Sequence, residues 1–258
     1  MLVHTFVHLP HVGRKTEQKY WAQGIQNWES LLSHIKEKSS ASSRFSRIEK
    51  ALLNTFDNQR NPLYFNSLLP ARERWRLYPD FMENCVFLDI ETTGASTWEN
   101  EITVIGLYDG KEFKQFINGF NLEDFENEIY RYELIVTFNG STFDLPFIRY
   151  FFRHFDPPAA HIDLRYVMAD LGFRGGLKSI ERELGLERPS EVEGFSGWEA
   201  VWLWERYRNG DRGALELLLE YNRQDVVNLK KLLEFACEKH VGEYVSNFID
   251  YRLPWKSL

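Results

Sequence analysis

The segment CVFLDIETTG, residues 85–94, decides how the rest of the chain is interpreted. It begins with an apolar run broken only by Asp89, which is typical of a strand buried in the middle of a sheet. Side chains two apart in a strand project from the same face, so Asp89 and Glu91 should present two carboxylates at the strand's C-terminal edge. Two such acids repel and are costly to bury unpaired. A bound cation removes both penalties; a strand end that reaches solvent is the ordinary alternative.

The chain after this segment alternates strand-like and helix-like runs. Asp109-Gly110 between two apolar runs is a strong hairpin signal. A hairpin, a helical crossover to another strand and then a series of helices predict an α/β layer with a mixed sheet. The further strands are expected at 103–108, 113–117 and 134–138, and the helices at 123–132, 143–155, 163–171, 177–184, 198–208 and 211–239.

A second acidic position follows the strand expected at 134–138, in NGSTFD, residues 139–144. Asn-Gly ends the strand, and Ser141 or Thr142 can cap the helix that begins there. Asp144 then falls in the first helical turn, near the tip of the preceding strand. The ordinary explanation is that the helix dipole favours an acid at this place.

A third acidic position is in YNRQD, residues 221–225, on the last long helix. Residues four apart lie on one helical face, so Tyr221 and Asp225 are neighbours. Leu218 and Leu232 extend the same core-facing stripe, and Asp225 stands where an apolar residue is expected. With 12 tyrosines in the chain, this spacing arises about once by chance, so its weight comes from the other two motifs.

The three motifs together supply Asp89, Glu91, Asp144 and Asp225, in that order, with no Cys or His partner. Four carboxylates form a hard, all-oxygen ligand set that suits Mg²⁺ or Mn²⁺ and argues against zinc. Two such ions roughly 3.5 to 4 Å apart are the clamp used for phosphodiester displacement. The pattern therefore predicts metal-dependent phosphoryl chemistry.

LDIETTG, NGSTFD and YNRQD resemble the three exonuclease motifs of the DEDD superfamily of 3′→5′ exonucleases, in the branch with Tyr before the final Asp. LPHVGRKTE, RERWRLYPDF, GGLKSIERELGL and the segment from GWEAVWLWERYRNGD to YNRQD resemble the bacterial YprB-like predicted exonucleases over nearly the whole chain. The resemblance implies a ribonuclease-H-like mixed five-stranded sheet flanked by helices. It also implies that the four acids bind two Mg²⁺ or Mn²⁺ ions and that Tyr221 orients the attacking water or helps to deprotonate it. Because a free tyrosine has a pKa near 10, we expect Tyr221 to position the water rather than act as a strong base.

The first 80 residues differ from the rest in charge and in pattern. They hold 12 Lys and Arg against 7 Asp and Glu, a net of +5, whereas residues 81–258 have a net of -12. Residues 1–57 are expected to form a small all-helical unit and residues 58–80 an extended connector, because prolines interrupt it. LPHVGRKTE, residues 9–17, resembles the hairpin of helix-hairpin-helix DNA-binding modules, with His11 at the first glycine position. A purely structural helical cap is the alternative.

Several residues are expected to contact the substrate in addition to the acids. An extended connector would place its three arginines on one side, as a track for the nucleic-acid backbone. Lys178 follows Gly175-Gly176 and is either a backbone contact or part of a solvated face. Helical spacing favours a core position for at least two of Trp198, Trp202 and Trp204, although each is a possible stacking platform. The expected contacts are Thr92, Asn139, Lys178, Arg72, Arg74, Arg76, Arg14 and Lys15.

Composition limits the classes of protein that this chain can be. Its 258 residues are 43% hydrophobic, which is enough for a sizeable core, and no apolar run approaches the roughly 20 residues of a membrane span. No secretory signal is recognised, and two cysteines make no disulfide framework, so we expect a cytoplasmic protein. A net charge of -7 argues against coating nucleic acid by charge alone.

These observations predict a metal-dependent 3′→5′ exonuclease, with residues 81–258 as the catalytic domain, acting on DNA or RNA 3′ ends, most simply single-stranded ones. Two alternatives stay open. One is a nucleic-acid-binding module of this fold without useful catalysis. The other is a structure-specific endonuclease of the same fold class.

Overall fold

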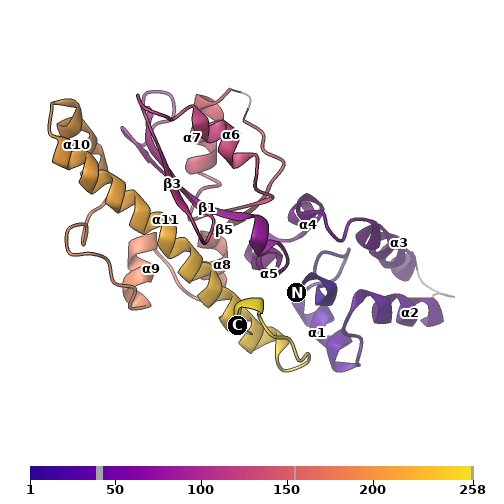
Figure 1. The fold of residues 1–258 in the computed structure, drawn as a ribbon. Coiled ribbons are helices and arrows are strands. Elements are labelled where there is room, and N and C mark those ends of the chain that lie inside the picture. Colours follow the sequence, from indigo (N-terminus) through magenta and orange to yellow (C-terminus); the bar gives the residue numbers. More distant parts are fainter. Residues whose placement is uncertain (39–42, 154, 257–258) are drawn as a thin grey trace. The chain divides into compact units, whose positions relative to one another are not determined.

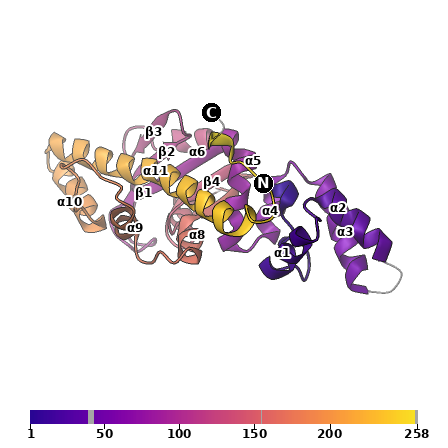
Figure 2. The same cartoon turned by 90° about the horizontal axis from the view of Figure 1, so that it is seen from below.

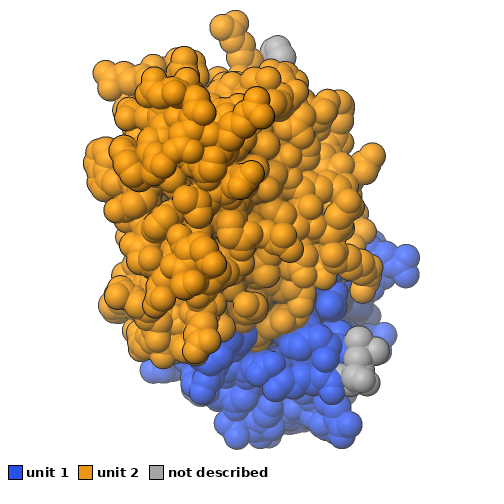
Figure 3. Space-filling view, turned by 60° about the vertical axis from the view of Figure 1, so that its left-hand side comes forward, with its two compact units in different colours: residues 1–82, 235–258 blue, residues 83–234 orange. Residues whose placement is uncertain are grey.

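The computed structural model describes residues 1–38, 43–153 and 155–256 (Figure 1). The chain divides into two compact units, one made of residues 1–82 with 235–258 and the other of residues 83–234 (Figure 3). We call them unit 1 and unit 2. The domain boundaries expected from the sequence stay a prediction. No helix in the described ranges is long and apolar enough to cross a membrane.

Unit 2 is built on one mixed five-stranded sheet with the order β3-β2-β1-β4-β5. β1 pairs antiparallel with β2 and parallel with β4, while β2–β3 is antiparallel and β4–β5 parallel. This arrangement confirms the predicted α/β fold with a mixed sheet. The strands are β1 (Cys85–Thr92), β2 (Ile102–Tyr108), β3 (Phe113–Ile117), β4 (Leu134–Thr137) and β5 (Ala160–Asp163).

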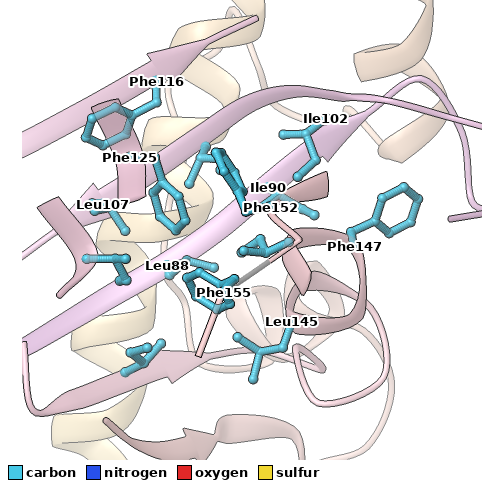
Figure 4. Packing of buried hydrophobic residues seen from close by; sticks show 14 of the residues in the cluster. Leu88, Ile90, Ile102, Leu107, Phe116, Phe125, Leu145, Phe147, Phe152 and Phe155 are labelled. Carbon is cyan, nitrogen blue, oxygen red and sulfur yellow. The ribbon is translucent and has the colours of Figure 1, made fainter. Parts of the chain in front are cut away.

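Helices cover both faces of this sheet, and each face has its own apolar core. Val86, Leu88 and Ile90 of β1 pack against α6 and α7 in a cluster rich in phenylalanine (Figure 4). Because side chains alternate along a strand, Asp89 and Glu91 lie on the opposite face, where α10 and α11 pack. The helices of unit 2 are α6 (Asp124–Ile129), α7 (Asp144–Phe151), α8 (Leu164–Asp170), α9 (Leu177–Glu183), α10 (Gly197–Arg208) and α11 (Arg212–His240), of which residues 212–234 belong to unit 2.

A glycine in β2 lets α11 come close to the centre of the sheet (Figure 2). Gly106 pairs with Asp89 across β1 and β2. A Cβ atom on Gly106 would lie 2.2 Å from Asn222 Oδ1 and 2.8 Å from Val226 Cγ2, both on α11. Any side chain at this position would therefore push α11 away from the strand that carries the acids.

Unit 1 is helical, which confirms the predicted helical N-terminal region. His11 has a φ of 61°, in the left-handed region that favours glycine, at the place where the helix-hairpin-helix motif has its first glycine. The elements are η1 (Leu2–His4), α1 (Arg14–Ala22), α2 (Trp28–Lys38), α3 (Ser43–Asp57), α4 (Pro62–Leu68), η2 (Ala71–Leu77) and α5 (Tyr78–Phe81), η3 (Met82–Asn84) at the boundary with unit 2, and η4 (Val241–Val245) and η5 (Pro254–Lys256) near the end of the chain.

The prediction of an extended connector at residues 58–80 is wrong, because this segment is mostly helical. Its prolines do not interrupt helices but begin them: Pro62 opens α4 behind an Asn61 cap, and Pro79 lies in the first turn of α5. A proline at a helix start loses no hydrogen bond. In the 3₁₀-helix η2, with three residues per turn, positions two apart point in different directions. Arg72, Arg74 and Arg76 therefore do not share one side.

Candidate active site

Three of the four predicted acids come together at the C-terminal end of β1. Asp89 and Glu91 project from β1 and Asp225 from α11, and one carboxylate oxygen of each lies within 4.8 Å of the others. Glu91 and Asp225 are buried and Asp89 is half-buried. Asn222, one turn before Asp225, places its Nδ2 3.4 Å from both the carbonyl oxygen and Oδ2 of Asp89. The strand and the helix are thus joined at the cluster itself.

Asp144 lies beside this cluster but is not one of the three clustered carboxylates. It begins α7, is buried, and its Oδ1 accepts a hydrogen bond from the backbone N–H of Ile90 at 3.2 Å. Burial raises the pKa of Asp144 to about 7, against the lowering effect of its backbone hydrogen bonds. Asp144 lies in the first turn of α7, as expected, and its hydrogen bond to Ile90 places it next to β1.

The electrostatics of the cluster fit a divalent cation. Burial raises the pKa of Asp89 and of Glu91 well above the ordinary values, and the neighbouring carboxylates add to the rise. Oε1 of Glu91 is buried and has no hydrogen-bond partner among the residues that the structure describes. Clustered carboxylates with a buried unsatisfied oxygen are the chemical setting in which Mg²⁺ or Mn²⁺ binds. Asp89, Glu91 and Asp225 are therefore the residues that would hold such an ion.

Lys178 and Tyr221 form a pair next to the acids. Lys178 Nζ donates a hydrogen bond to the hydroxyl of Tyr221 and lies 4.1 Å from the centre of its ring. Burial lowers the pKa of Lys178. Burial also raises the pKa of Tyr221, and the charges of Asp225, Glu91 and Asp89 raise it further. Tyr221 therefore stays protonated at neutral pH.

Arg188 and Glu181 belong to the site, and sequence reasoning did not find them. Arg188 forms an ion pair with Asp225, and its Nε donates to Glu181 Oε2 at 2.8 Å. Asn228 on α11 donates to Glu181 Oε1 at 2.9 Å. Arg188 lies in a polar loop after α9 with no motif around it, so no signal in a single sequence points to it.

A cavity of about 370 Å³ opens in front of the acids. Its wall combines the clustered carboxylates and Tyr221 with Phe143, Trp198 and Val201. Trp198 is 77% exposed and Trp202 54% exposed, so the expectation that at least two of the three tryptophans are core is wrong. Trp198 and Trp202 lie four apart on one face of α10, whereas Trp204 lies on the buried face.

Thr92 and Asn139, the other predicted contacts in unit 2, both have internal hydrogen-bond partners. Thr92 lines the cavity, and its hydroxyl donates to the carbonyl oxygen of Gly94 at 2.7 Å. Asn139 has a φ of 65°, and its N–H donates to Asp163 Oδ1 at 2.7 Å. Asp163 also accepts from the N–H and hydroxyl of Ser141 and caps α8. It thus holds the turn that leads into Asp144.

The predicted basic contacts of unit 1 are only partly available to a ligand. Arg76 is 1% exposed and pairs with Glu17 at 2.9 Å and Glu73 at 3.0 Å, so its assignment to a substrate track is wrong. Arg14 pairs with Glu73 and lies over the ring of Tyr244. Arg72 and Lys15 are exposed, and Arg74 is half-buried. The positive charge of unit 1 is therefore partly used for internal pairing.

Comparison with known proteins defines the class to which this fold belongs. Residues 86–237 match the RNase_H_2 family model, described as RNase_H superfamily. The match covers more than half of the chain, so this protein belongs to the RNase H superfamily. The chain is similar to the uncharacterized protein MJ0365 of Methanocaldococcus jannaschii, with 29% identity over 160 residues, 54% of this chain and 87% of that one.

Three solved structures are similar to the chain at low sequence identity. The family B DNA polymerase of Pyrobaculum calidifontis is 15% identical over 61% of this chain, with a TM-score of 0.46, and the match spans 24% of the polymerase. NrnC of Brucella melitensis is 16% identical, with a TM-score of 0.44, covering 66% of this chain and 80% of NrnC. The Nibbler EXO domain of Aedes aegypti is 14% identical, with a TM-score of 0.44, covering 66% of this chain and 85% of that domain.

Proposed function

We propose that this protein is a metal-dependent 3′→5′ exonuclease that removes nucleotides from single-stranded DNA or RNA. The observation that carries the proposal is the cluster of Asp89, Glu91 and Asp225, within 4.8 Å of one another on the wall of a cavity of about 370 Å³. In an RNase H-like fold such a cluster is suited to hydrolysis of a phosphodiester bond. The direction of cleavage, the tyrosine class, the YprB-like family and the use of two ions rest on the resemblance of the three motifs.

The acids have distinct places in this proposal. Asp89, Glu91 and Asp225 would hold a first ion, and Asp144, buried beside β1, would help to hold a second. When bound, the ions would supply Lewis acidity for the attack of water on the phosphate. Arg188 fixes the carboxylate of Asp225 by pairing with one of its oxygens, Glu181 accepts from Arg188, and Asn228 donates to Glu181. Arg188 is thus proposed to position the metal ligand Asp225.

Tyr221 is proposed to position the attacking water by a hydrogen bond. Its raised pKa leaves the phenol protonated, and Lys178 donates to the phenol oxygen, so the phenol O–H is directed to another acceptor. A protonated tyrosine is a poor general base and a good hydrogen-bond donor. We therefore assign Tyr221 to the orientation of water and not to proton abstraction.

The cavity wall supplies a place for the terminal nucleotide. Phe143 and the exposed Trp198 offer ring faces in the same cavity as the acids. Stacking of a base on an aromatic ring contributes about 1–3 kcal/mol and tolerates any base sequence. Inside a duplex, stacked neighbouring base pairs cover both faces of a base, which favours a frayed or single-stranded end.

Digestion of labelled oligonucleotides tests the proposal. We expect the wild-type protein with Mn²⁺ to shorten 5′-labelled single-stranded DNA or RNA stepwise from the 3′ end, and EDTA to stop the reaction. Asp89→Asn should abolish it, whereas Glu123→Gln, which removes one exposed carboxylate elsewhere in unit 2, should not. Absence of cleavage of DNA, RNA and duplex by the wild type refutes the proposal. Cleavage of circular single-stranded DNA would show an endonuclease instead.

A further inference from the structure

Three cavities in unit 2 lie next to one another in a row that begins at the acids, and we call this row the groove. The metal-side cavity, described above, shares Asp89, Asp225 and Gly197 with a bridging cavity of about 290 Å³. The bridging cavity shares Phe138, Gly176 and Leu177 with a third cavity of about 550 Å³. We call the third one the arginine cavity. Because each cavity shares wall residues with the next, the groove runs from the acids to the arginine cavity.

The arginine cavity has the opposite charge from the metal-side cavity. Arg165 on α8 and Arg174 in the loop between α8 and α9 line it, and no acidic side chain of the described residues does so. Arg165 and Arg174 are both exposed. In the part of the chain that the structure describes, Arg174 forms neither an ion pair nor a hydrogen bond. Its guanidinium is therefore available to an anion.

Asn139 gives Arg165 a defined position on the wall of this cavity. Arg165 Nη1 donates to Asn139 Oδ1 at 2.5 Å, and Thr142 Oγ1 donates to the same oxygen at 2.9 Å. Since two donors use this oxygen, the amide NH₂ group of Asn139 is left to donate. The wall therefore presents two guanidinium groups and one amide, all of them donors. Asp163 accepts hydrogen bonds from the backbone N–H groups of Asn139 and Arg165 but does not line the cavity. Side-chain donors on a wall that carries no carboxylate are the chemistry that binds a phosphate oxygen.

We infer that the arginine cavity binds the phosphates of a nucleic-acid strand upstream of the linkage held at the acids. This inference rests on the proposed function and extends it, because it places the body of the strand along a groove in unit 2. The order of charges supports it: carboxylates for divalent ions stand at one end of the groove, and arginines stand at the other. A substrate of one or two nucleotides would not need the second end, whereas a polyanion that spans the groove contacts both.

Binding of oligonucleotides of two lengths tests the inference without requiring catalysis. The probes are 5′-fluorescein-labelled thymidine oligonucleotides of two and ten nucleotides, with phosphorothioate 3′ linkages that resist cleavage. Fluorescence anisotropy with Mg²⁺ gives the Kd of the full chain at several salt concentrations. The double variant Arg165→Gln/Arg174→Gln is compared with Arg212→Gln, which removes an exposed arginine that lines none of the three cavities.

The expected result is a length-dependent loss of affinity. The double variant should raise the Kd of the ten-nucleotide probe about tenfold or more, with less than a twofold change for the dinucleotide. The slope of log Kd against log salt should fall by about 1.4, because each phosphate contact on a single strand contributes roughly 0.7. Arg212→Gln should change neither quantity.

Two results would overturn the inference. One is an unchanged Kd and salt slope for the longer probe in the double variant; the other is an equal loss for both lengths, which would indicate a general effect on the protein. Failure of the proposed function shows separately, as absence of cleavage of unmodified oligonucleotides by the wild type. Length-dependent binding without cleavage would support the arginine cavity and refute the exonuclease.

Discussion

Removing the hydroxyl of Tyr221 tests water positioning separately from metal binding. Tyr221 contacts Lys178 and lines the cavity, but it is not one of the clustered carboxylates. We expect Tyr221→Phe to lower the rate of oligonucleotide cleavage about 10²-fold, because misplacement of a reacting group costs this much. Isothermal titration should find its affinity for Mn²⁺ within twofold of the wild type. An equal loss of Mn²⁺ affinity would contradict this division of roles.

His8 is the residue through which unit 1 should respond to pH. It is buried, its Nε2 is 3.0 Å from Thr55 Oγ1, and burial, with a smaller effect of Arg76, lowers its pKa to about 3. The unfolded chain binds this proton near pH 6.5 and the folded chain does not. The contribution of neutral His8 to the free energy of unfolding is therefore fully present above pH 6.5 and is lost as the pH falls toward 3.

The size of this effect can be measured by denaturant unfolding. Between pH 7 and pH 5, His8 should account for about 2 kcal/mol of the loss in the free energy of unfolding. His8→Gln has an amide in place of the imidazole and does not titrate, so its unfolding should depend less on pH by this amount. Arg76 and Arg14 lower the pKa of Glu73 against the raising effect of burial, so Glu73 loses its stabilising effect only below about pH 4.5 and lies outside the window. An identical pH dependence of the variant and the wild type would refute the assignment.

At the scale of elements, the packing of β2 against α11 determines whether the site forms. Gly106→Ala would place a methyl group 2.2 Å from Asn222 Oδ1 and 2.8 Å from Val226 Cγ2. We expect a loss of about 1–3 kcal/mol in the free energy of unfolding from overpacking. Cleavage should be reduced as well, because α11 also carries Tyr221 and Asp225.

A glycine on α11 itself, Gly213, provides the control for this substitution. A Cβ atom on Gly213 would meet Asp211 Oδ1 at 3.5 Å, an ordinary contact. Gly213→Ala should therefore leave cleavage unchanged and stabilise the protein by up to about 1 kcal/mol, because alanine is a better helix former. Equal effects of the two alanines in denaturant unfolding and cleavage would show that the approach of α11 to β2 is not critical.

A helix or strand can be predicted from the sequence when its periodic pattern of apolar residues is long enough to be recognised. The apolar run of β1 and the long amphipathic α11 were identified, and with them the acids that the structure brings together. The strand β5 was not located, because it has four residues, one of them half-buried His161, and follows two prolines. Tertiary contacts such as the pairing of Arg188 with Asp225 leave no local pattern at all.

At the scale of the whole molecule, net charge is a poor guide to where a polyanion binds. The chain has a net charge of -7, yet part of its negative charge is gathered in a cluster that suits divalent ions. Conversely, the excess of basic residues in the first 80 residues includes Arg76, whose charge is buried against Glu17 and Glu73. The arrangement of charges within each unit therefore decides the binding surface, and the sum over the chain does not.

The same clustering links the stability of the protein to its metal. Burial and mutual repulsion raise the pKa of Asp89, so the charged form of this residue destabilises the fold when no ion is bound. In EDTA we expect Asp89→Asn to unfold at higher denaturant concentration than the wild type. With Mg²⁺ at about 100 times its Kd, the wild type should gain about 2.7 kcal/mol and the variant far less, because only the wild type retains the full ligand set.

The order of the two stabilities should therefore reverse between EDTA and Mg²⁺, whereas Glu123→Gln should follow the wild type in both. An equal stabilisation of Asp89→Asn and the wild type by Mg²⁺ would remove Asp89 from the metal site, and a less stable variant in EDTA would show that Asp89 stabilises the fold without an ion.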